Sequence, residues 1–392
     1  MSGLFAALML RRAGWDIDVF ERVDGELSGR GAGIVAQPDL IAILNDLALV
    51  PGDLGVHVDR RRILDAQGRI TNECACPQVM TAWERVYRLL RDAFPPERYH
   101  RGKTLRVFED TGRSVVAHFT DGDRIEADLL VGADGLRSTV RQQCLPDAVP
   151  LYAGYVGWRA LIDERDIPAK THRDIFGYMA FCLPPGEQML GYPVAGPDND
   201  LRPGHRRYNM VWYRPADETT ELARLLTDEN GVTHAISIPP NLIRRQCLEE
   251  MRAAAQRLLA PQFVEIVRLA SQPLLQPIYD MESPRMAFGR VALIGDAAFV
   301  ARPHVGAGVT KAAEDARELV RALDGSSDVP QALLCFEKVR LSVGRQVVQR
   351  ARHLGAYLQA AQLTAEEQSS SARHSIPEAV MIETATLDFL HA

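Results

Sequence analysis

Residues 291–308, VALIGDAAFVARPHVGAG, constrain the fold of this chain more than any other stretch. A short apolar run ends at Gly295-Asp296, a loop rich in glycine and alanine follows, and the next residues, TKAAEDARELVRAL, have helical periodicity. In a parallel α/β sheet, such a strand–loop–helix unit presents an acid and free backbone N–H groups at the carboxyl edge of the sheet. We therefore expect Asp296 to accept a hydrogen bond from a ligand hydroxyl, and the loop to donate N–H groups to a flat or anionic group.

The composition limits the kind of protein that this chain can be. Its 392 residues predict two domains rather than one small core. Its net charge of −6 argues against nucleic acid as a partner, and no stretch approaches the roughly 20 apolar residues of a membrane span. Six scattered cysteines lack the spacing of a zinc site or a disulfide framework, so we expect free thiols, no metal site and a cytoplasmic location.

The order of the periodic segments predicts an α/β fold in several parts. Helix and strand patterns alternate over residues 1–150, whereas strand patterns separated by turn signals over 151–280 predict a mainly antiparallel sheet. Residues 281–345 return to the first pattern, and 346–392 predict C-terminal helices and a tail, of which 366–375 are expected to be loose. The sequence therefore indicates a Rossmann-like domain that is interrupted by a sheet domain.

The first residues match the end of a dinucleotide-binding fingerprint. In that fingerprint a strand precedes G-x-G-x-x-G, and an acid about 20 residues further on binds a ribose. Gly3 corresponds to the last glycine and Glu21 to the acid, whereas the first strand and the first two glycines are absent from this sequence. We expect Met1 to be an internal methionine of a longer gene product. An ordinary helix followed by an ordinary strand is the equally weighted alternative.

A second strand–turn–helix unit lies at Gly132-Ala133-Asp134-Gly135. The strand expected over 125–131 runs into this turn, and the residues LRSTVRQQCL after it predict a helix. Asp134 is placed to accept hydrogen bonds from ligand hydroxyls. Taken alone, the motif is more simply a turn in which Asp134 caps the following helix.

The three motifs, in this order and at these spacings, resemble the aromatic-ring hydroxylase family of FAD-dependent monooxygenases, which has the p-hydroxybenzoate hydroxylase fold. The resemblance covers roughly residues 1–345 and implies a Rossmann-like FAD-binding domain. The stretches YAGYVGWR (152–159) and PPERYH (95–100) resemble the members of this family that act on dihydroxypyridines.

The resemblance implies a set of cofactor contacts along the chain. Glu21 would bind the adenosine ribose, and Arg22 and the loop 29–33 would lie along FAD. Asp134 would touch both FAD and the nicotinamide donor, and Asp296 would hold the ribityl hydroxyls. The full set of implied cofactor-binding residues is Gly3, Glu21, Arg22, Asp134, Gly295, Asp296, Pro303, Gly306, Ala307 and Gly308.

The resemblance also implies the reaction and the partners. NADH or NADPH reduces FAD, the reduced flavin captures O₂ as a C4a-hydroperoxide, and a small hydroxylated aromatic or N-heteroaromatic ring is hydroxylated. A second copy of the chain is retained as a candidate partner. Two alternatives stay open: another FAD-dependent oxidoreductase on the same scaffold, and a truncated protein with impaired flavin binding and no activity.

The substrate is expected between the 303–308 loop and the sheet domain. His304 would hydrogen-bond or deprotonate a ring hydroxyl, because the pKa of histidine ordinarily lies near neutrality. The candidates to line the site from the sheet strands are Tyr155, Arg159, Tyr192 and Tyr213. The alternative is structural: a histidine in a proline-containing loop and tyrosines in strands often serve packing alone.

Overall fold

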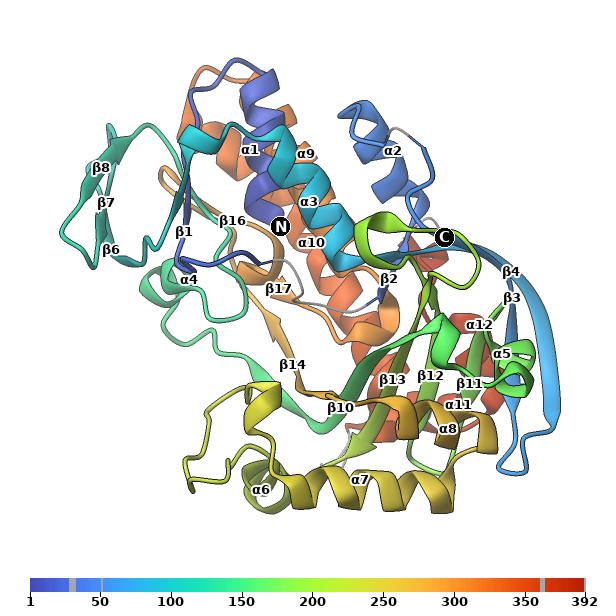
Figure 1. The fold of residues 1–392 in the computed structure, drawn as a ribbon. Helices are drawn as coiled ribbons and strands as arrows, with labels where there is room; N and C mark the ends of the chain where they lie inside the picture. Colours follow the sequence, from blue (N-terminus) through green and yellow to red (C-terminus); the bar gives the residue numbers. More distant parts are fainter. Residues whose placement is uncertain (28–32, 51, 360–363, 391–392) are drawn as a thin grey trace.

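The computed structural model describes residues 1–27, 33–50, 52–359 and 364–390. A large curved sheet occupies one part of the molecule, and smaller sheets and three long helices occupy the other (Figure 1). The mixed α/β class predicted from the sequence is confirmed.

The large sheet has nine strands in the order β17-β14-β10-β13-β12-β11-β3-β4-β2. All its pairs are antiparallel except β11 with β3. Its strands are β2 (Gly33–Ala36), β3 (Val56–Leu64), β4 (Ile70–Ala82), β10 (Leu151–Asp163), β11 (Met179–Cys182), β12 (Gln188–Val194), β13 (Arg207–Pro215), β14 (Leu274–Glu282) and β17 (Phe299–Val300). Residues before 100 and after 298 thus join the sheet predicted over 151–280, and the domain boundaries stay a prediction.

The two faces of this sheet have different surroundings because side chains alternate along each strand. In β10, Val156, Trp158 and Ala160 pack into a core with the sheet-covering helices α7 (Arg245–Leu258) and α8 (Pro261–Leu269). Tyr155 lies in a separate core on the other face, which it shares with residues of the C-terminal segment. Polar residues at odd positions of β10 therefore lie away from the α7–α8 core.

Two small sheets, each with one parallel pair of strands, lie in the other part of the molecule. The first pairs β1 (Val19–Glu21) with β5 (Tyr99–Arg101), and the second has the order β15-β16-β9, in which β16 (Val291–Leu293) is parallel to β9 (Leu130–Gly132) and β15 is Ala287–Phe288. Among the described residues, no pairing joins the first unit to the second.

The prediction of one strand over 125–131 is wrong. The structure divides this stretch between β8 (Arg124–Ala127) and β9, which belong to different sheets. β8 completes an antiparallel arm with β6 (Leu105–Asp110) and β7 (Val115–Phe119). The chain bends between β8 and β9, where the guanidinium of Arg290 donates to the Asp128 carbonyl at 3.0 Å.

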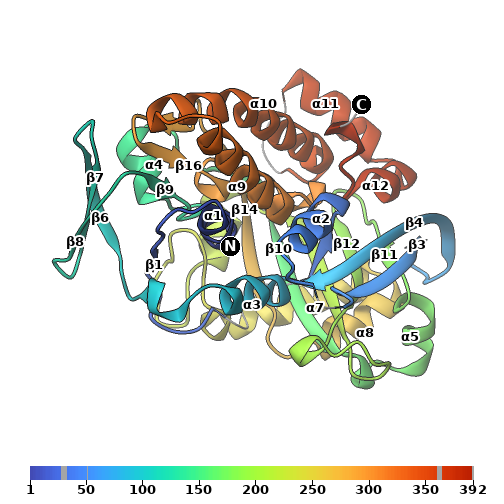
Figure 2. The same cartoon turned by 90° about the horizontal axis from the view of Figure 1, so that it is seen from above.

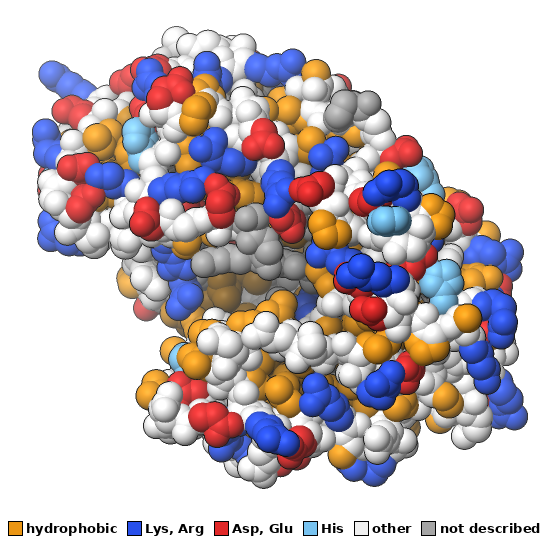
Figure 3. All heavy atoms as spheres, in the orientation of Figure 1, with side chains coloured by type: hydrophobic (Ala, Val, Ile, Leu, Met, Phe, Trp, Pro, Cys, Tyr) orange, Lys and Arg blue, Asp and Glu red, His pale blue; other side chains and the backbone are white. Residues whose placement is uncertain are grey.

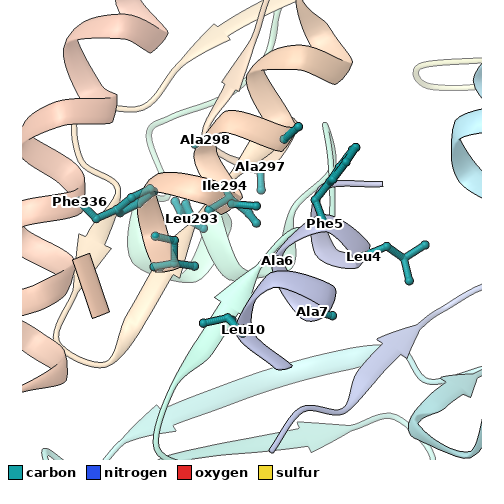
Figure 4. Close-up of a cluster of buried hydrophobic side chains, with 14 of the residues drawn as sticks. Leu4, Phe5, Ala6, Ala7, Leu10, Leu293, Ile294, Ala297, Ala298 and Phe336 are labelled. Carbon is teal, nitrogen blue, oxygen red and sulfur yellow. The ribbon is translucent and has the colours of Figure 1, made fainter. Parts of the chain in front are cut away.

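Three helices cover the β16 unit. α1 (Ser2–Arg12) packs on α9 (Gly308–Asp324), and α9 packs on α10 (Val329–Gly355), as seen from above in Figure 2. Figure 4 shows α1 against residues 293–298, with Phe336 of α10 in the same cluster. The remaining α-helices of the described chain before residue 300 are α2 (Pro38–Asp46), α3 (Trp83–Ala93), α4 (Thr139–Cys144), α5 (Ala169–Ile175) and α6 (Ala223–Leu225).

The expectation of a loose tail over 366–375 is wrong, because this stretch forms α11 (Ala365–His374). Thr364 and Glu367 form a capping box at its start, and α12 (Pro377–Glu383) follows. The Glu383 carboxylate lies 3.1 Å from Nε2 of His374 and accepts a hydrogen bond from the guanidinium of Arg350 at 2.8 Å. These contacts connect α11 and α12 to α10. Within the described ranges, no helix is long and apolar enough to span a lipid bilayer.

Candidate flavin and substrate site

The strand–loop–helix unit at 291–308 forms as predicted. β16 is followed by the 3-10 turn η6 (Gly295–Ala297), β17, the turn η7 (Pro303–Val305) and α9. Gly295 has φ of +60°, and a Cβ atom there would lie 2.6 Å from the hydroxyl oxygen of Ser2. Glycine at 295 is therefore required both by the backbone conformation and by the close approach of α1.

A buried cluster of charged residues, which the sequence did not predict, is hydrogen-bonded to the backbone of this loop at Gly295. We call Asp315, Lys311 and Arg340 the Asp315 cluster. Asp315 accepts the backbone N–H of Gly295 at 2.9 Å and the Nε of Arg340 at 2.7 Å, and the Lys311 ammonium donates to the Gly295 carbonyl at 2.9 Å. The only signal in the sequence was the i,i+4 spacing of Lys311 and Asp315 on one helix.

Asp296 is placed to bind a ligand. Its side chain is exposed, yet surrounding protein raises the pKa of its carboxyl, while Lys311 and the amino group of Met1 lower it. Within the described chain no hydrogen bond or ion pair joins this carboxylate to another residue. Burial lowers the pKa of the Met1 amino group, whereas Glu21 and Asp296 raise it, so both acids lie within electrostatic range of the start of α1.

The start of α9 is open in the way that a flat or anionic ligand requires. Gly306 has φ of +63°, and nothing lies within 4 Å of a Cβ built on Gly308. No side chain caps the helix, and the hydroxyl of Thr310 in its first turn is buried without a partner in the described structure. Free N–H groups, an unpaired acid at 296 and this hydroxyl fit the ribityl chain and ring of FAD.

The other residues that the resemblance implies for cofactor binding differ in their exposure and in their contacts. Glu21 ends β1 as predicted and accepts the N–H of Val23 at 2.9 Å, and Arg22 is exposed. A Cβ on Gly3 would lie 3.3 Å from Ala133, so the start of α1 packs on the turn after β9. In the loop 29–33, residues 29–32 lie outside the described residues.

Asp134 is engaged locally. Its carboxylate accepts the hydroxyl of Ser138 at 2.5 Å and the N–H of Val140 at 3.2 Å, both at the start of α4. The N-cap residue of α4 is Ser138, whose hydroxyl accepts the N–H of Arg141 at 2.9 Å, so Asp134 supports the cap that the simpler alternative assigned to Asp134 itself. A contact with cofactor or nicotinamide is left to the proposal below.

The structure brings the predicted substrate residues together. The hydroxyl of Tyr155 lies 2.9 Å from Nε2 of His304, and the Tyr213 ring centroid lies 4.4 Å from that of His304. We call Tyr155, Tyr213 and His304 the tyrosine–histidine cluster. Arg159 donates to the Tyr213 hydroxyl at 3.3 Å, and Arg159 and Tyr213 both act on the pKa of Tyr192.

The electrostatics of the cluster correct one expectation. His304 is only 2% exposed, and burial together with nearby positive charges lowers its pKa to about 3. Burial raises the pKa of the Tyr155 hydroxyl. The expected near-neutral pKa of His304 is therefore wrong, and the imidazole is neutral at physiological pH.

Residues of the C-terminal segment complete the cluster, although the sequence carried no motif for them. A Cβ on Gly355 would lie 2.5 Å from the Tyr155 hydroxyl, and Tyr357 in the turn η8 (Ala356–Leu358) is acted on by the charges of Tyr155 and Tyr213. The buried side-chain polar atoms that lack a partner within the described residues include His304 (Nδ1), Arg159 (Nε) and Tyr357 (hydroxyl), and both amide atoms of Gln188 on β12. A ligand beside His304 would supply a partner for the first of these.

The segment that follows α12 is hydrogen-bonded to the loop that carries His304. The N–H of Ala385 donates to the His304 carbonyl at 2.7 Å. The Ala385 carbonyl in turn accepts hydrogen bonds from the side-chain amides of Gln37 at 3.1 Å and Gln78 at 2.8 Å.

In the orientation of Figure 1, the surface of the molecule has a hollow between the part over α1 and α3 and the part over α6 and α7 (Figure 3). No group of acids, histidines and cysteines in the described residues has the arrangement of a metal site.

Comparisons with known proteins agree with this geometry. A family model described as "FAD binding domain" matches residues 247–351, and one described as "FAD binding domain-like" matches 152–280. The chain is 34% identical, over 92% of its length and 89% of the relative's, to 2,6-dihydroxypyridine 3-monooxygenase of Paenarthrobacter nicotinovorans. It is 31% identical, over 90% of its length and 84% of the relative's, to 3-amino-4-hydroxybenzoate 2-monooxygenase of Streptomyces cremeus.

Solved structures give the same result. The 2,6-dihydroxypyridine-3-hydroxylase from Arthrobacter nicotinovorans superposes with a TM-score of 0.86 at 32% identity, covering 93% of this chain and 92% of that one. HpxO of Klebsiella pneumoniae, solved with FAD and uric acid, shares the fold with a TM-score of 0.74 at 22% identity, covering 97% and 94%. On these relatives and on this fold, the chain belongs to the FAD-dependent monooxygenases that hydroxylate small aromatic rings.

Proposed function

We propose that the substrate is a hydroxylated aromatic or N-heteroaromatic ring, of the hydroxypyridine kind, and that it binds at the tyrosine–histidine cluster. His304, Tyr155, Arg159, Tyr192 and Tyr213 are the proposed substrate residues. The observation that carries this proposal is Nδ1 of His304, a buried nitrogen without a partner in the described residues, with unpaired atoms of Arg159 and Tyr357 within electrostatic range of the same cluster. The relatives named for dihydroxypyridine and aminohydroxybenzoate support the class of ring.

Electrostatics favour an ionised ring oxygen at this position. The positive charges of Arg159 and Arg302 both lower the pKa of His304, so both lie within electrostatic range of that imidazole. A phenolate-like oxygen gains from two nearby cations in a buried place where water screens them little. The cluster residues thus orient the ring and exclude water.

The FAD contacts are proposed from the open start of α9 and the unpaired acid. Asp296 would hold the ribityl hydroxyls, and Glu21 the adenosine ribose. Bound FAD, reduced by NADH or NADPH, supplies the oxygen-transfer chemistry with O₂. The remaining proposed cofactor contacts are Gly3, Arg22, Asp134, Gly295, Pro303, Gly306, Ala307 and Gly308.

The organisation of the protein is part of the same proposal. The FAD-binding domain would comprise 1–150 and 281–345, the substrate sheet 151–280, and the C-terminal helices 346–392. A cytoplasmic location is consistent with six free cysteines. Size-exclusion chromatography with light scattering would test the homodimer that we retain as a candidate.

A substrate screen tests the function. The flavin-loaded protein is mixed with NADH or NADPH, and O₂ uptake is followed with 2,6-dihydroxypyridine, 6-hydroxynicotinate and 3-hydroxybenzoate. We expect one ring to stimulate oxidation and to be recovered as a hydroxylated product. Stimulation by none of these rings, or oxidation without a hydroxylated product, would contradict the proposal.

A matched pair of variants tests the site. Arg159→Met is expected to lower kcat/KM about 10–100-fold, because a charge-assisted hydrogen bond to the ring oxygen is lost. The control is Arg165→Met, which removes an exposed arginine shortly after β10 whose side chain is 75% exposed. Equal kcat/KM values for the two variants would remove Arg159 from the site.

A further inference from the structure

The hydrogen bond between Tyr155 and His304 raises the question of which atom carries the proton. The Tyr155 hydroxyl and Nε2 of His304 are 2.9 Å apart, and both side chains are buried. A neutral imidazole has one N–H donor and one acceptor nitrogen. If the tyrosine donates, Nε2 is the acceptor and Nδ1 carries the proton.

The surroundings of Tyr155 favour donation by its hydroxyl. The positive charge of Arg302 lies close enough to lower the pKa of this hydroxyl against the effect of burial, and the Arg302 guanidinium is held at 2.8 Å by Asp280. A hydroxyl beside a fixed cation turns its oxygen toward the charge and its hydrogen away from it. The nearby acceptor for that hydrogen is Nε2 of His304.

The surroundings of His304 exclude the alternative in which both nitrogens are protonated. Three cationic or titratable groups face it from different elements: Arg302 before η7, Arg159 on β10 and His374 on α11, and each of them lowers its pKa. The phenol rings of Tyr155 and Tyr213 lie against the imidazole and offer no negative charge. Asp280 is occupied by Arg302 and Arg352.

The geometry points to Tyr155 as a positioning residue that fixes the Nδ1–H tautomer of His304, so that His304 donates a hydrogen bond to a ring oxygen and does not remove a proton from the ring. This inference deepens the proposed function and rests on it for the identity of the acceptor. Nδ1 is a buried nitrogen without a partner in the described structure, and a ring oxygen would satisfy it. With a pKa near neutrality His304 would act as a base, whereas in this tautomer it acts as a hydrogen-bond donor.

The tautomer is measurable without any substrate. In the full chain labelled with ¹⁵N-histidine, two-dimensional NMR distinguishes the protonated from the bare ring nitrogen, and His304→Asn identifies the signals of His304. We expect Nδ1 to be protonated in the wild type. A wild-type His304 that is protonated at Nε2, or at both nitrogens at pH 7, would overturn the inference.

Two tyrosine variants test the role of Tyr155. Tyr155→Phe removes the hydroxyl bonded to Nε2, and we expect the Nδ1–H form to lose its majority. Tyr213→Phe is the matched control, since its ring centroid lies even closer to that of His304, at 4.4 Å against 5.7 Å for Tyr155, while the hydrogen bond to Nε2 comes from Tyr155. An unchanged tautomer in Tyr155→Phe would contradict the positioning role, whether or not the enzyme turns over.

Kinetics separate a donor from a base. Asparagine at 304 offers an amide N–H near the place of Nδ1 but cannot take a proton, whereas leucine offers neither. We expect His304→Asn to keep kcat/KM within about tenfold of the wild type and His304→Leu to lose more, while loss of a general base would cost about 10²–10⁴-fold in both. Equal large losses in the two variants would overturn the donor role. If the wild type turns over no ring, the proposed function fails, and the NMR result still decides the tautomer.

Discussion

Two buried polar clusters contact the same loop, one at Gly295 and the other at His304, and they differ in how completely their groups are paired. In the Asp315 cluster, Asp315 has two charged partners and a backbone N–H, and these contacts fix Gly295. In the tyrosine–histidine cluster, Nδ1 of His304 has no partner in the described part of the chain, and neither has Nε of the neighbouring Arg159. The carboxylate of Asp315 is fully paired in the protein alone, although Nη2 of Arg340 has no partner in the described residues, whereas Nδ1 of His304 has no protein partner there.

This difference indicates different roles for the two clusters. The Asp315 cluster has a structural role, because its contacts fix the loop, whereas the tyrosine–histidine cluster is the proposed place of the substrate. A buried charge whose partners are all present stabilises the fold only as long as none of them is removed. A buried donor without a partner lowers stability until a ligand accepts its hydrogen bond. We therefore expect opposite responses when polar groups are deleted from the two clusters.

The largest effect is expected at Asp315. Asp315→Asn leaves Lys311 and Arg340 buried without their main counter-charge and should lower the free energy of unfolding by about 3–5 kcal/mol, measured by urea denaturation. Glu314→Gln is the control, since Glu314 contacts the same Arg340 at 3.3 Å from a more exposed position. Similar losses for the two variants would mean that Asp315 has no special role.

The next effect concerns pH. The pKa of His304 is about 3 in the folded protein, against an ordinary value of 6.5, so the unfolded chain binds more protons between these values. Stability should fall as pH falls through this window, by about 1.4 kcal/mol per pH unit for one proton. His304→Gln should show a shallower slope than the wild type in urea titrations, with His57→Gln as the control for loss of an exposed histidine. Parallel slopes in wild type and His304→Gln would contradict the neutral, buried state.

A smaller effect is expected at Gly355. In Gly355→Ala the new methyl group would meet the Tyr155 hydroxyl at 2.5 Å and His304 at 3.1 Å, and overpacking of this kind costs about 1–3 kcal/mol. The control is Gly325→Ala near the end of α9, where the nearest atom would be 3.5 Å away. A Gly355→Ala protein as stable as the control would show that the C-terminal segment does not close on the cluster.

The smallest effect compares an unpaired with a paired buried amide outside the two clusters. Gln188→Met removes two amide atoms that have no partner in the described residues from a fully buried side chain, and it should change the free energy of unfolding by less than about 1 kcal/mol, or increase it. Gln262→Met is the matched variant, because the Gln262 amide donates to Asp174 at 3.0 Å and to the Gly68 carbonyl at 3.1 Å. We expect it to lose about 1–3 kcal/mol. Equal losses in thermal unfolding would show that Gln188 has a partner of its own.

The parts of the fold that the sequence predicted are those with strong local periodicity. α1, α3 and β10 lie where their patterns placed them. The split at Asp128 was not predicted, because the arginine that is bonded to the bend comes from the distant turn between β15 and β16, and periodicity carries no information on such a contact. Helix α11 was missed because its polar composition resembles that of a disordered segment, while its partner Glu383 follows later in the chain.

The candidate site was predictable to the extent that motifs carry it. Asp296 and the loop after it follow from the strand–loop–helix pattern. Tyr155 and His304 are 149 residues apart, so their hydrogen bond depends on tertiary structure. Gly355 and Tyr357 belong to no motif, and only the packing of α10 against the sheet reveals them.

The alternation along β10 has a consequence for how this enzyme can change. Because successive side chains lie on opposite faces, substitutions at Tyr155 or Arg159 change the face of the proposed substrate site, while Trp158 stays in the core with α7 and α8. A deletion of one residue would shift the following side chains of the strand to the other face, so that a guanidinium would enter the core with the helices. If the proposed site is correct, point mutations in this strand can alter the substrate, whereas changes in its length disrupt the core.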